Sequence, residues 1–599
     1  MDDFFSRAAD SEASFKSILI NQSQRMSWIR LLMFILMVFA AAATYDLSPS
    51  GNALGAAAIC VICFIAFIVA VRHHRAIRHR ILRSDCHLAV LSRLMGQHRG
   101  AWSKLLYDGA EYLKDAPPQA KDLSLFGEHS LFQYICMART KMGRDHLSNV
   151  IKDAIVPDEE VIAIAKKRQG AAAELAKEPE QLTSLLSALE LVKEGTDSSD
   201  ALAAISNKST RDSSVLLRYG LPVITFITLA ISVMGLLPWE VPALLFLLQL
   251  TISTAMTRRT AEVLSPLGEM HAELAPYKAV FLAIQEADFK DPYLRELQQR
   301  FTGDGVNAAD ALRTLSRITD AAYMRQNLVF LLLGNALFLW DLHCNAWLAA
   351  WKRRCGMRFG TWLTALAEFE TLFSFASIAA TRKTWCIPAL LDSNAPEFNI
   401  REAHHPLLSE NENVPNDTDA FAETRIITGS NMSGKTTYLR TLAISAVMAY
   451  AGALVPAKSF KLTRMAIFTS IRVEDDIAHG ISTFYAELLR IKQMIDYSKS
   501  KQPMFIVIDE IFKGTNSADR ITGAEEAIRH LTNPWSITMV STHDFELCDL
   551  KASDGHPVDN FHFDEHYEND KILFDYKLKE GRCQTTNAKY LLHMAGIID

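Results

Sequence analysis

An eight-residue segment in the C-terminal third, Gly429–Thr436, has the composition of a loop that binds phosphate. It follows a short apolar run, Arg425–Thr428, and reads G-x-x-x-x-G-K-T. The glycines let backbone N–H groups turn inward around phosphate oxygens, and Lys435 would bring a positive charge to the β- and γ-phosphates. Thr436 would offer its hydroxyl to Mg²⁺ and begin a helix whose N-terminus favours anions. The order strand, loop, helix predicts a site for ATP and Mg²⁺.

Two further apolar runs end in residues that suit phosphate chemistry. Phe505–Ile508 is followed by Asp509, which could hold Mg²⁺, and by Glu510, which could polarise an attacking water. Alone, this pattern equally fits an ordinary strand end, but its place after Lys435 in one domain favours catalysis. Ile537–Val540 leads to His543, which could hydrogen-bond the γ-phosphate or its water.

Length and composition set wider limits. A chain of 599 residues is too long for one core, so we expect several domains. The net charge of −6 gives no general attraction to nucleic acid, so DNA binding would need local basic patches. The nine cysteines form no legible disulfide framework, as in a reducing cytosol. Cys60 and Cys63 lie in an apolar run without a second pair, which favours packing over a metal or redox role.

Two apolar hairpins precede the phosphate loop. The first joins Leu31–Tyr45 to Ala53–Val71 through the turn residues of Asp46–Asn52. The 19 residues of Ala53–Val71 would extend about 28 Å as a helix, close to the thickness of the hydrocarbon core. The second hairpin joins Tyr219–Leu237 to Val241–Thr257. Both are predicted to cross a membrane.

Basic residues flank both hairpins on one side. Arginines crowd the exit of the first hairpin, and cations lie at both ends of the second: Arg72, Arg75, Arg78, Arg80, Arg83, Lys208, Arg211, Arg218, Arg258 and Arg259. Because cations favour the cytoplasmic side, we expect a multi-pass protein of the inner or plasma membrane with its ATPase domain in the cytoplasm. Anionic lipid or nucleic acid could also meet the first cluster. Two alternatives stay open, a signal peptide cleaved near Ala40–Ala43 and a second hairpin buried in a soluble core.

The remaining segments indicate a multidomain chain. Apolar residues recur at helical spacing through 84–218 and 258–387, and Leu328–Trp340, too short to span a bilayer, predicts a core helix. From residue 388, short apolar runs alternate with helical stretches, as in an α/β domain with a largely parallel sheet. The expected order is a cytoplasmic segment 1–25, hairpin 26–71, helical region 84–218, hairpin 219–257, helical region 258–387 and an α/β P-loop NTPase domain of ABC type, 388–599.

Five sequence blocks together resemble the MutS family of DNA mismatch-repair ATPases. They are Ile427–Arg440 with its Asn431-Met432 pair, Ala449–Ala457, Ile467–Glu487, Asp509–Thr515 and Ser541–His543. Weaker similarity to the family's helical core begins near Ser130, and Trp362–Ala376 resembles its lever helices. The chain looks like a membrane-anchored variant of this family.

The resemblance implies a homodimer through the ATPase domain, in which each site is completed by a signature loop of the partner. Ser482, with Thr483, would then face the partner's γ-phosphate. Glu510 would be the base and His543 the γ-phosphate sensor. Asn431 and Lys435 would bind the γ-phosphate within one chain, and the other nucleotide-binding residues implied are Gly429, Ser430, Met432, Ser433, Gly434, Thr436 and Thr437.

The chain departs from the family in the parts that contact DNA. The mismatch-binding N-terminal domain finds no room, because the first hairpin uses that region, and the second hairpin replaces the clamp insertion. Ser430 and Ser433 stand where the family often has Pro and Gly, between the fixed positions of the motif. Three functions remain open: a membrane-anchored MutS-like ATPase in DNA repair, a membrane signalling or scaffold ATPase that acts on a protein partner without DNA, and an ABC-type transporter. The lack of an L-S-G-G-Q motif and of charges within the apolar runs disfavours transport.

Overall fold

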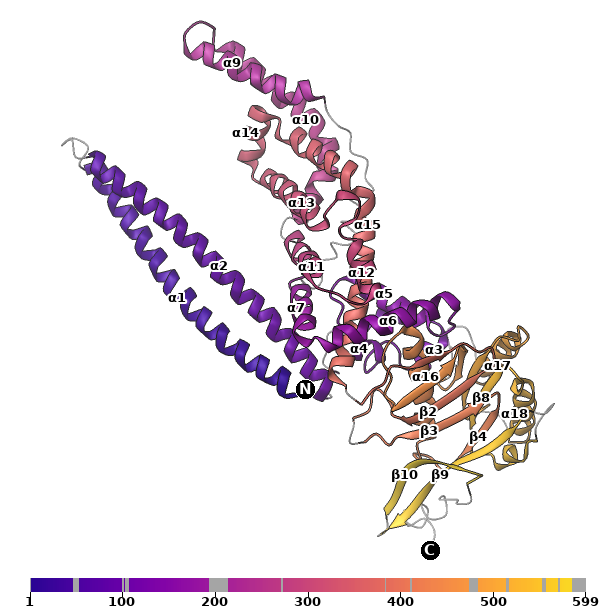
Figure 1. The fold of residues 1–599 in the computed structure, drawn as a ribbon. Coiled ribbons are helices and arrows are strands. Elements are labelled where there is room, and N and C mark those ends of the chain that lie inside the picture. Colours follow the sequence, from indigo (N-terminus) through magenta and orange to yellow (C-terminus); the bar gives the residue numbers. More distant parts are fainter. Residues whose placement is uncertain are drawn as a thin grey trace. The chain divides into compact units, whose positions relative to one another are not determined.

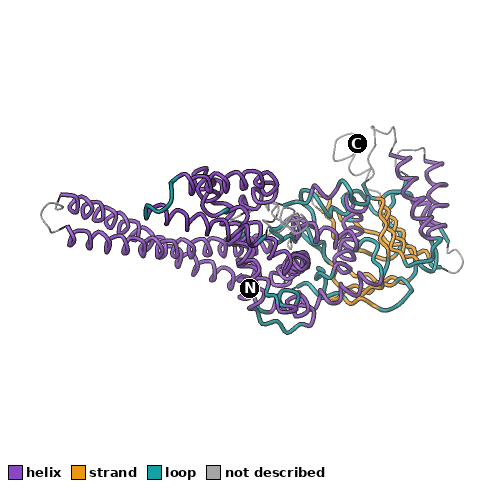
Figure 2. Tube along the Cα trace, turned by 90° about the horizontal axis from the view of Figure 1, so that it is seen from above, coloured by secondary structure: helices purple, strands orange, loops and turns teal. Residues whose placement is uncertain are grey.

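The computed structural model describes residues 2–46, 53–99, 102, 107–192, 214–270, 273–382, 384–409, 412–472, 483–512, 517–551, 556–568 and 571–583. They form two compact units, each built from separate stretches of chain. One holds Met1–Gly96, Pro179–Asp288 and Gln298–Ala365; the other holds Gln97–Glu178, Phe289–Leu297 and Leu366–Asp599. Helices make up the N-terminal part, and the described strands all follow Pro388 (Figures 1 and 2). The coarse prediction of a mostly helical N-terminal part and a C-terminal α/β region is confirmed.

Two long helices begin the first unit. α1 (Asp2–Asp46) and α2 (Ala53–Arg99) pair antiparallel, as Figure 1 shows. Phe34 packs against Phe67, with ring centroids 6.2 Å apart, and Lys16 pairs with Asp85 at 2.6 Å. Both helices continue well beyond the apolar runs, so the helical hairpin is longer than the sequence pattern alone indicates.

Four described helices are long and apolar enough to cross a membrane by length and composition: Phe4–Ala43, Ala58–His98, Leu216–Val233 and Trp340–Thr381. The first three expose their apolar side chains; Phe39, for example, is 70% exposed. The fourth is buried within the protein. Exposed apolar side chains therefore concentrate on the two hairpins.

The second hairpin consists of η4 (Leu216–Gly220), α9 (Leu221–Val233) and α10 (Glu240–Glu269). α14 (Leu328–Phe338) packs against both α9 and α10, and Phe226 meets Phe338 with ring centroids 5.6 Å apart. The prediction that this segment is a core helix is wrong. The side chains of α14 are apolar on nearly every face of the helix. Only Gly334 and Asn335 of this helix are buried, and Leu328 is 67% exposed.

The other helices of the first unit are shorter, apart from α15, which continues into the second unit. They are α7 (Pro179–Glu190), α11 (Leu274–Glu286), α12 (Pro292–Gln299, whose last residues belong here), η6 (Gly303–Gly305), α13 (Ala308–Tyr323), η7 (Met324–Gln326) and α15 (Trp340–Thr381). Asn307 caps α13 by accepting a hydrogen bond from the backbone N–H of Asp310 at 3.1 Å. Its apolar stripe then packs on α10 and α11.

The helical part of the second unit precedes the sheets in sequence. It contains η3 (Ala110–Leu113), α3 (Pro118–Asp122), α4 (Leu131–Ile135), α5 (Lys141–Asp153) and α6 (Glu159–Lys177). Side-chain caps fix the starts of the last three helices: Ser130, Thr140 and Asp158 each accept a hydrogen bond from a backbone N–H three residues on. α5 and α6 pack against α16 (Lys435–Ala451), the helix that follows the phosphate loop.

A buried ion pair joins α6 to α15 inside this unit. Arg168 donates to both carboxylate oxygens of Glu368, with Nε–Oε1 at 2.7 Å and Nη2–Oε2 at 2.9 Å. Tyr293 donates to the same carboxylate at 3.0 Å, and His146 lies 3.2 Å from it. Burial opposes the charge, yet Arg168 holds the pKa of Glu368 below its ordinary value. Such a pair costs most when one partner is lost.

Two sheets complete the unit. The smaller has the order β1-β5-β2-β3, and the larger has the order β10-β9-β4-β8-β7-β6, parallel from β9 to β6. The strands are β1 (Ala389–Leu391), β2 (Glu397–Ala403), β3 (Asn416–Phe421), β4 (Thr424–Thr428), β5 (Ser459–Thr463), β6 (Ala466–Ser470), β7 (Met504–Asp509), β8 (Ser536–Ser541), β9 (Val558–Glu568) and β10 (Lys571–Glu580). A short η9 (Phe545–Asp549) follows β8.

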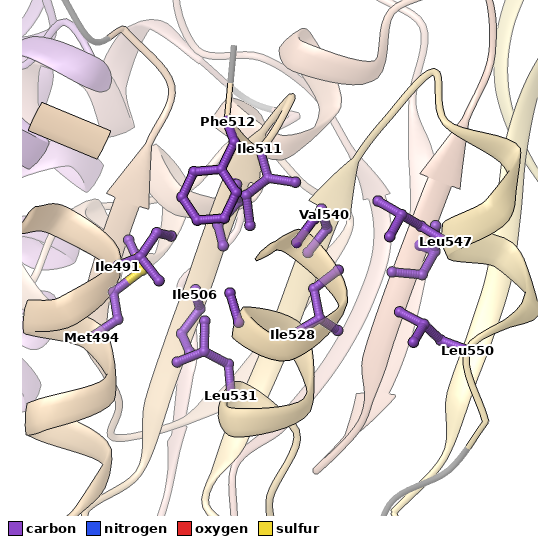
Figure 3. Packing of buried hydrophobic residues seen from close by; sticks show 14 of the residues in the cluster. Ile491, Met494, Ile506, Ile511, Phe512, Ile528, Leu531, Val540, Leu547 and Leu550 are labelled. Carbon is purple, nitrogen blue, oxygen red and sulfur yellow. The ribbon is translucent and has the colours of Figure 1, made fainter. Parts of the chain in front are cut away.

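An apolar cluster holds α17 (Thr483–Ser498) and α18 (Ser517–Leu531) on one face of the larger sheet. In Figure 3, Ile528 and Leu531 of α18 lie close to Ile506 of β7, and Val540 of β8 belongs to the same cluster. Phe505, next along β7, points to the opposite face and packs against Phe398, with ring centroids 4.8 Å apart. Because β4 and β7 both pair in parallel with β8, the carboxyl ends of these three strands lie at one edge of the sheet.

Removing the Glu368 carboxylate should strongly destabilise the second unit. Glu368→Ala leaves Arg168 charged, buried and unpaired, which should lower the free energy of unfolding by about 3–5 kcal/mol. Asp392→Asn is a matched control, because Asp392 pairs with Lys166 at 2.9 Å but is 90% exposed, and it should change stability by less than about 1 kcal/mol. Urea unfolding of the full chain followed by circular dichroism measures both, and equal losses would contradict the assignment.

Candidate functional site

The phosphate loop connects β4 to α16, and its backbone requires two of its glycines. Gly429 and Gly434 have φ angles of 145° and 104°. A Cβ at Gly429 would lie 2.8 Å from the Phe563 carbonyl oxygen, and one at Gly434 would lie 3.1 Å from the Tyr576 ring. Met432 also has a positive φ, 69°, and its side chain is 85% exposed. The loop is thus a tight turn whose shape depends on glycine.

Lys435 lies in the first turn of α16 with its ammonium folded over the loop. Its Nζ donates to the carbonyl oxygens of Gly429 at 2.7 Å and Ser430 at 2.9 Å. Burial lowers the pKa of Lys435, and the nearby Glu510 and Asp509 carboxylates oppose that shift. The loop therefore carries a buried positive charge next to two acidic groups.

Asp509 joins three elements at the end of β7. Its Oδ2 accepts a hydrogen bond from the Thr436 hydroxyl at 2.9 Å, and its Oδ1 accepts one from the Ser541 hydroxyl at the end of β8. A hydroxyl and a carboxylate side by side are the hard oxygen ligands that Mg²⁺ takes, together with phosphates and water. Within the described part of the chain, no three acidic, His or Cys side chains cluster as they would around a metal ion.

Glu510 and His543 meet directly beyond the strand ends. His543 Nε2 lies 3.2 Å from Glu510 Oε1 and 2.9 Å from Asn431 Oδ1. Glu510 has a φ of 57°, and its backbone N–H donates to the Ser541 carbonyl at 3.0 Å. A left-handed backbone at a glutamate is uncommon, and here it turns the side chain toward the loop. The structure thus brings together the residues singled out in all three strand-end segments.

A cavity of about 600 Å³ adjoins the loop. Its lining includes residues 430–437, Glu510, Phe563 and Tyr576. The segment after β2 forms another wall of the cavity. There the Asn413 side chain accepts a hydrogen bond from the His405 backbone N–H at 2.9 Å and donates one to the His405 carbonyl at 2.7 Å. Burial lowers the pKa of His405 to about 3, which favours the neutral imidazole, and its Nδ1 accepts a hydrogen bond from the Leu407 backbone N–H at 3.2 Å. The cavity has the size of a small-ligand site.

Some predicted residues cannot be placed, and some functional candidates were missed. Ser482, Gly514 and Thr515 lie outside the described residues, and Thr483 begins α17. Glu565 of β9 accepts a hydrogen bond from the Ser430 hydroxyl. No pattern in the sequence marks Glu565 as part of the loop's surroundings, because the contact depends on the pairing of β9 with β4.

Asp122 at the end of α3 is another residue that the sequence does not reveal. Its buried carboxylate accepts hydrogen bonds from Thr469 Oγ1 at 2.7 Å, from the backbone N–H groups of Ile471 and Arg472, and from Arg490 Nη1 at 2.7 Å. Ile471 and Arg472 directly precede residues 473–482, and Arg490 lies on α17, which follows them. Asp122 thereby holds both flanks of the stretch in which the signature loop is predicted.

Arg440 extends these contacts to the phosphate-loop helix. It lies on α16 and donates to Ser124 Oγ at 2.7 Å, two residues beyond Asp122. Arg472 also reaches Ser124, at 3.4 Å. The helix that begins at Lys435 and the flank of the predicted signature loop therefore meet at one short segment after α3.

Comparison with known proteins identifies the family of this domain. The family model described as MutS domain V matches residues 425–598. The "DNA mismatch repair protein MutS" of Natronomonas pharaonis is 31% identical over 239 residues, 39% of this chain and 27% of the relative. The protein of the same name from Persephonella marina is 32% identical over 246 residues, 40% of this chain and 28% of the relative. "MutS protein homolog 4" of Mus musculus is 36% identical over 235 residues, 37% of this chain and 24% of the relative.

These alignments cover about a quarter of the length of each relative. The range that the family model matches contains the phosphate loop and the strand ends that carry Asp509 and His543. The C-terminal part of the chain, residues 425–598, is thus similar to MutS domain V.

Proposed function

We propose that this protein is a membrane-anchored, MutS-like ATPase that binds ATP with Mg²⁺ and hydrolyses it. The observation that carries the proposal is the convergence of Lys435, Thr436, Asp509, Glu510 and His543 at one sheet edge beside the cavity. A carboxylate next to a histidine and a buried lysine is a set of groups suited to phosphoryl transfer to water.

Each residue has a part in the proposed reaction. The loop N–H groups and the N-terminus of α16 cradle the phosphates, and Lys435 offsets their charge. Thr436 and Asp509 would hold Mg²⁺, which would supply positive charge beside the phosphates. Glu510 orients the water and accepts its proton. His543 Nε2, which contacts Glu510 and Asn431 in this structure, would have to leave these two acceptors to donate its hydrogen to the γ-phosphate.

The proposed active form is a homodimer of the ATPase domains. In it, Ser482 and Thr483 of one copy reach the γ-phosphate bound by the other. The contacts of Asp122 with Arg472 and Arg490 support this proposal, because they fix both flanks of the loop that would cross to the partner. A loop held at both flanks loses less conformational entropy when it docks.

We propose DNA repair as the process that the ATPase serves, since the relatives from Natronomonas pharaonis and Persephonella marina are named for mismatch repair. A specific observation favours the second candidate, a signalling or scaffold ATPase that acts on a protein partner. The family model matches residues 425–598, and the N-terminal part has long helices with exposed apolar runs. The two candidates differ in whether DNA is bound.

Membrane anchoring is supported by the two hairpins. The apolar runs of α1, α2 and α9 expose large side chains such as Ile62, Phe39 and Val233, whose contact with water would be costly. Three polar side chains, Ser23, Arg30 and His74, form a polar layer at one end of the apolar run of the first hairpin. His74 Nδ1 lies 2.8 Å from Arg30 Nη1, and His74 Nε2 lies 2.9 Å from Ser23 Oγ. This polar layer would lie at the cytoplasmic interface of an inner or plasma membrane.

Two substitutions test the proposed chemistry. Lys435→Ala should abolish ATP binding and turnover, because the loop loses its positive charge. Glu510→Gln should retain binding of a fluorescent ATP analogue while turnover falls about 10²–10⁴-fold, the usual contribution of a general base. Lys458→Ala is a control, since Lys458 pairs with Glu402 on an exposed surface. Phosphate release by the full chain in detergent measures turnover, and normal turnover in either site variant would refute these roles.

Binding to mismatched and perfect duplexes separates the two proposed processes. A DNA-repair ATPase should prefer the mismatched duplex, and its affinity should fall steeply as salt rises, since phosphate contacts release counterions. The measurement is fluorescence anisotropy of labelled duplexes with the full chain in detergent, with and without ATP. If neither duplex binds at low salt, DNA repair is excluded and the protein-partner function remains.

Protease treatment of intact and permeabilised cells tests the anchoring. The ATPase domain should be protected in intact cells and cleaved only after permeabilisation, because all large segments are proposed to be cytoplasmic. Membrane fractions should retain the chain after a high-salt wash. Cleavage of the ATPase domain from outside would contradict the topology, and release by salt alone would contradict the spanning hairpins.

A further inference from the structure

A second cavity lies in the first unit, where the pair of α1 and α2 meets α7 and α11. Its volume is about 690 Å³, and its lining comes from these four helices and from Leu191, directly after α7. His87 Nδ1 and Ser187 Oγ, both in the lining, lie 3.3 Å apart, and Arg93 pairs with Glu190 nearby at 3.7 Å, so α2 is joined to α7. None of the lining residues belongs to the proposed nucleotide site, and the cavity is therefore a separate candidate site.

Three cations line this cavity, and two of them share a face of α2. Arg80 and Arg83 are one helical turn apart and exposed, and Lys278 of α11 is half-buried. Within the part of the chain that the structure describes, none of the three has an ion-pair partner. The two acids in the lining, Glu12 and Glu286, form no ion pair with a described residue either. The cavity thus holds three cations that its two acids leave unpaired, which favours an anion.

A buried hydroxyl lies beside these arginines. Ser84 lines the cavity one helical turn after Arg80 and is only 2% exposed, and no described residue forms a hydrogen bond with its Oγ. Because a buried polar group without a partner costs free energy, a ligand that supplies the missing hydrogen bond would stabilise the folded chain. Arginine side chains and a serine hydroxyl are donors suited to phosphate oxygens. The unpaired charge and the unpaired hydroxyl therefore both indicate a phosphate group.

The rest of the lining is mainly apolar, which suits an organic group attached to that phosphate. The Arg80 guanidinium lies over the ring of Phe15, with 5.5 Å between its central carbon and the ring centroid. Leu191, Leu282 and several alanines add apolar surface. A cavity of about 690 Å³ is far larger than one phosphate and has the size of a site for a small organic molecule.

The position of the cavity along α2 favours a soluble ligand over a bilayer lipid. The polar layer of Ser23, Arg30 and His74 is proposed to lie at the cytoplasmic interface. Arg80 follows His74 by six residues and Ser84 follows it by ten, so they lie about 9 Å and 15 Å further along the helix. The phosphate of a bilayer lipid would stay near the polar layer. This choice between the two sources rests on the proposed anchoring.

We propose that this cavity binds a soluble organic phosphate. Arg80, Arg83 and Ser84 would bind the phosphate oxygens, and Lys278 would add a positive charge from α11. The organic part would lie against the apolar remainder of the lining. Because the contacts come from both pairs of helices, the bound ligand would join the first hairpin to the α7–α11 pair.

The experiment uses pyridoxal phosphate as the probe, because it carries a phosphate and an aldehyde that condenses with a lysine amine. The aldehyde carbon and Lys278 Nζ form an imine with loss of water, and borohydride then delivers hydride to the imine carbon and leaves a stable secondary amine. The full chain in detergent is labelled over a range of probe concentrations, and peptide mapping by mass spectrometry measures the labelled fraction of Lys278. Labelling should saturate, and pyridoxal, which lacks the phosphate, should require a concentration at least about tenfold higher.

Two double variants of α2 remove equal charge and separate the site from general charge effects. Arg80→Gln/Arg83→Gln should raise the probe concentration that half-labels Lys278 at least about tenfold, since two charge-assisted contacts are lost. Arg75→Gln/Arg78→Gln, whose arginines are exposed, equally spaced and outside the lining, should leave it unchanged. ATP turnover by each variant checks that the chain is folded.

The unpaired hydroxyl gives a further test. Ser84→Ala should weaken labelling of Lys278 by pyridoxal phosphate without lowering the urea concentration at which the chain unfolds, because the hydroxyl that it removes has no partner in the described chain. Labelling as in the natural chain would contradict the assigned contact.

Competition identifies the source of the phosphate. Glycerol phosphate in solution should protect Lys278 from the probe, and phosphatidylglycerol in the micelles should not. Protection by the lipid alone, equal labelling by pyridoxal, or the same labelling in the two double variants would each overturn the proposal. Lys435→Ala, which disables the proposed nucleotide site, should leave Lys278 labelling unchanged, so that the two proposals fail separately; a change there would mean that the label reports the nucleotide site instead.

Discussion

The proposed nucleotide site depends on the single carboxylate of Asp509. One oxygen accepts from Thr436 at the start of α16, and the other accepts from Ser541 at the end of β8. In the parallel sheet, Ser541 of β8 pairs with Asp509 of β7 on one side and with Ile427 of β4 on the other. The ends of these three strands are therefore in register. Glu510 follows Asp509 directly, and His543 follows Ser541 by two residues. If this carboxylate lost its partners, the phosphate loop, the proposed base and the histidine would no longer share one edge.

α16 connects this edge to the helical part of the second unit. Gly452, just beyond its end, has a φ of 94°, and a Cβ there would lie 2.7 Å from Arg168 Cβ. Arg168 is held by Glu368 of α15, and Arg440 of α16 reaches Ser124 beside Asp122. Packed interiors resist small displacements. A shift of the loop on binding of the proposed nucleotide would therefore displace α16 against Arg168 and against Ser124. The helices of the second unit that pack on α16 thus help to position the phosphate loop, although they contribute no group to the proposed chemistry.

The sequence was enough to predict the chemical groups, and tertiary contacts decided how they are supported. Gly429 and Gly434, the apolar runs and the strand-end acids are local patterns, and parallel strands bring their carboxyl ends together by rule. Asp122, by contrast, meets residues more than three hundred positions away, and Ser430 meets Glu565 only because β9 pairs with β4. The prediction for Leu328–Trp340 fails because a short helix that is apolar on every side has no face from which burial can be inferred. The signature residue Ser482 stays a prediction.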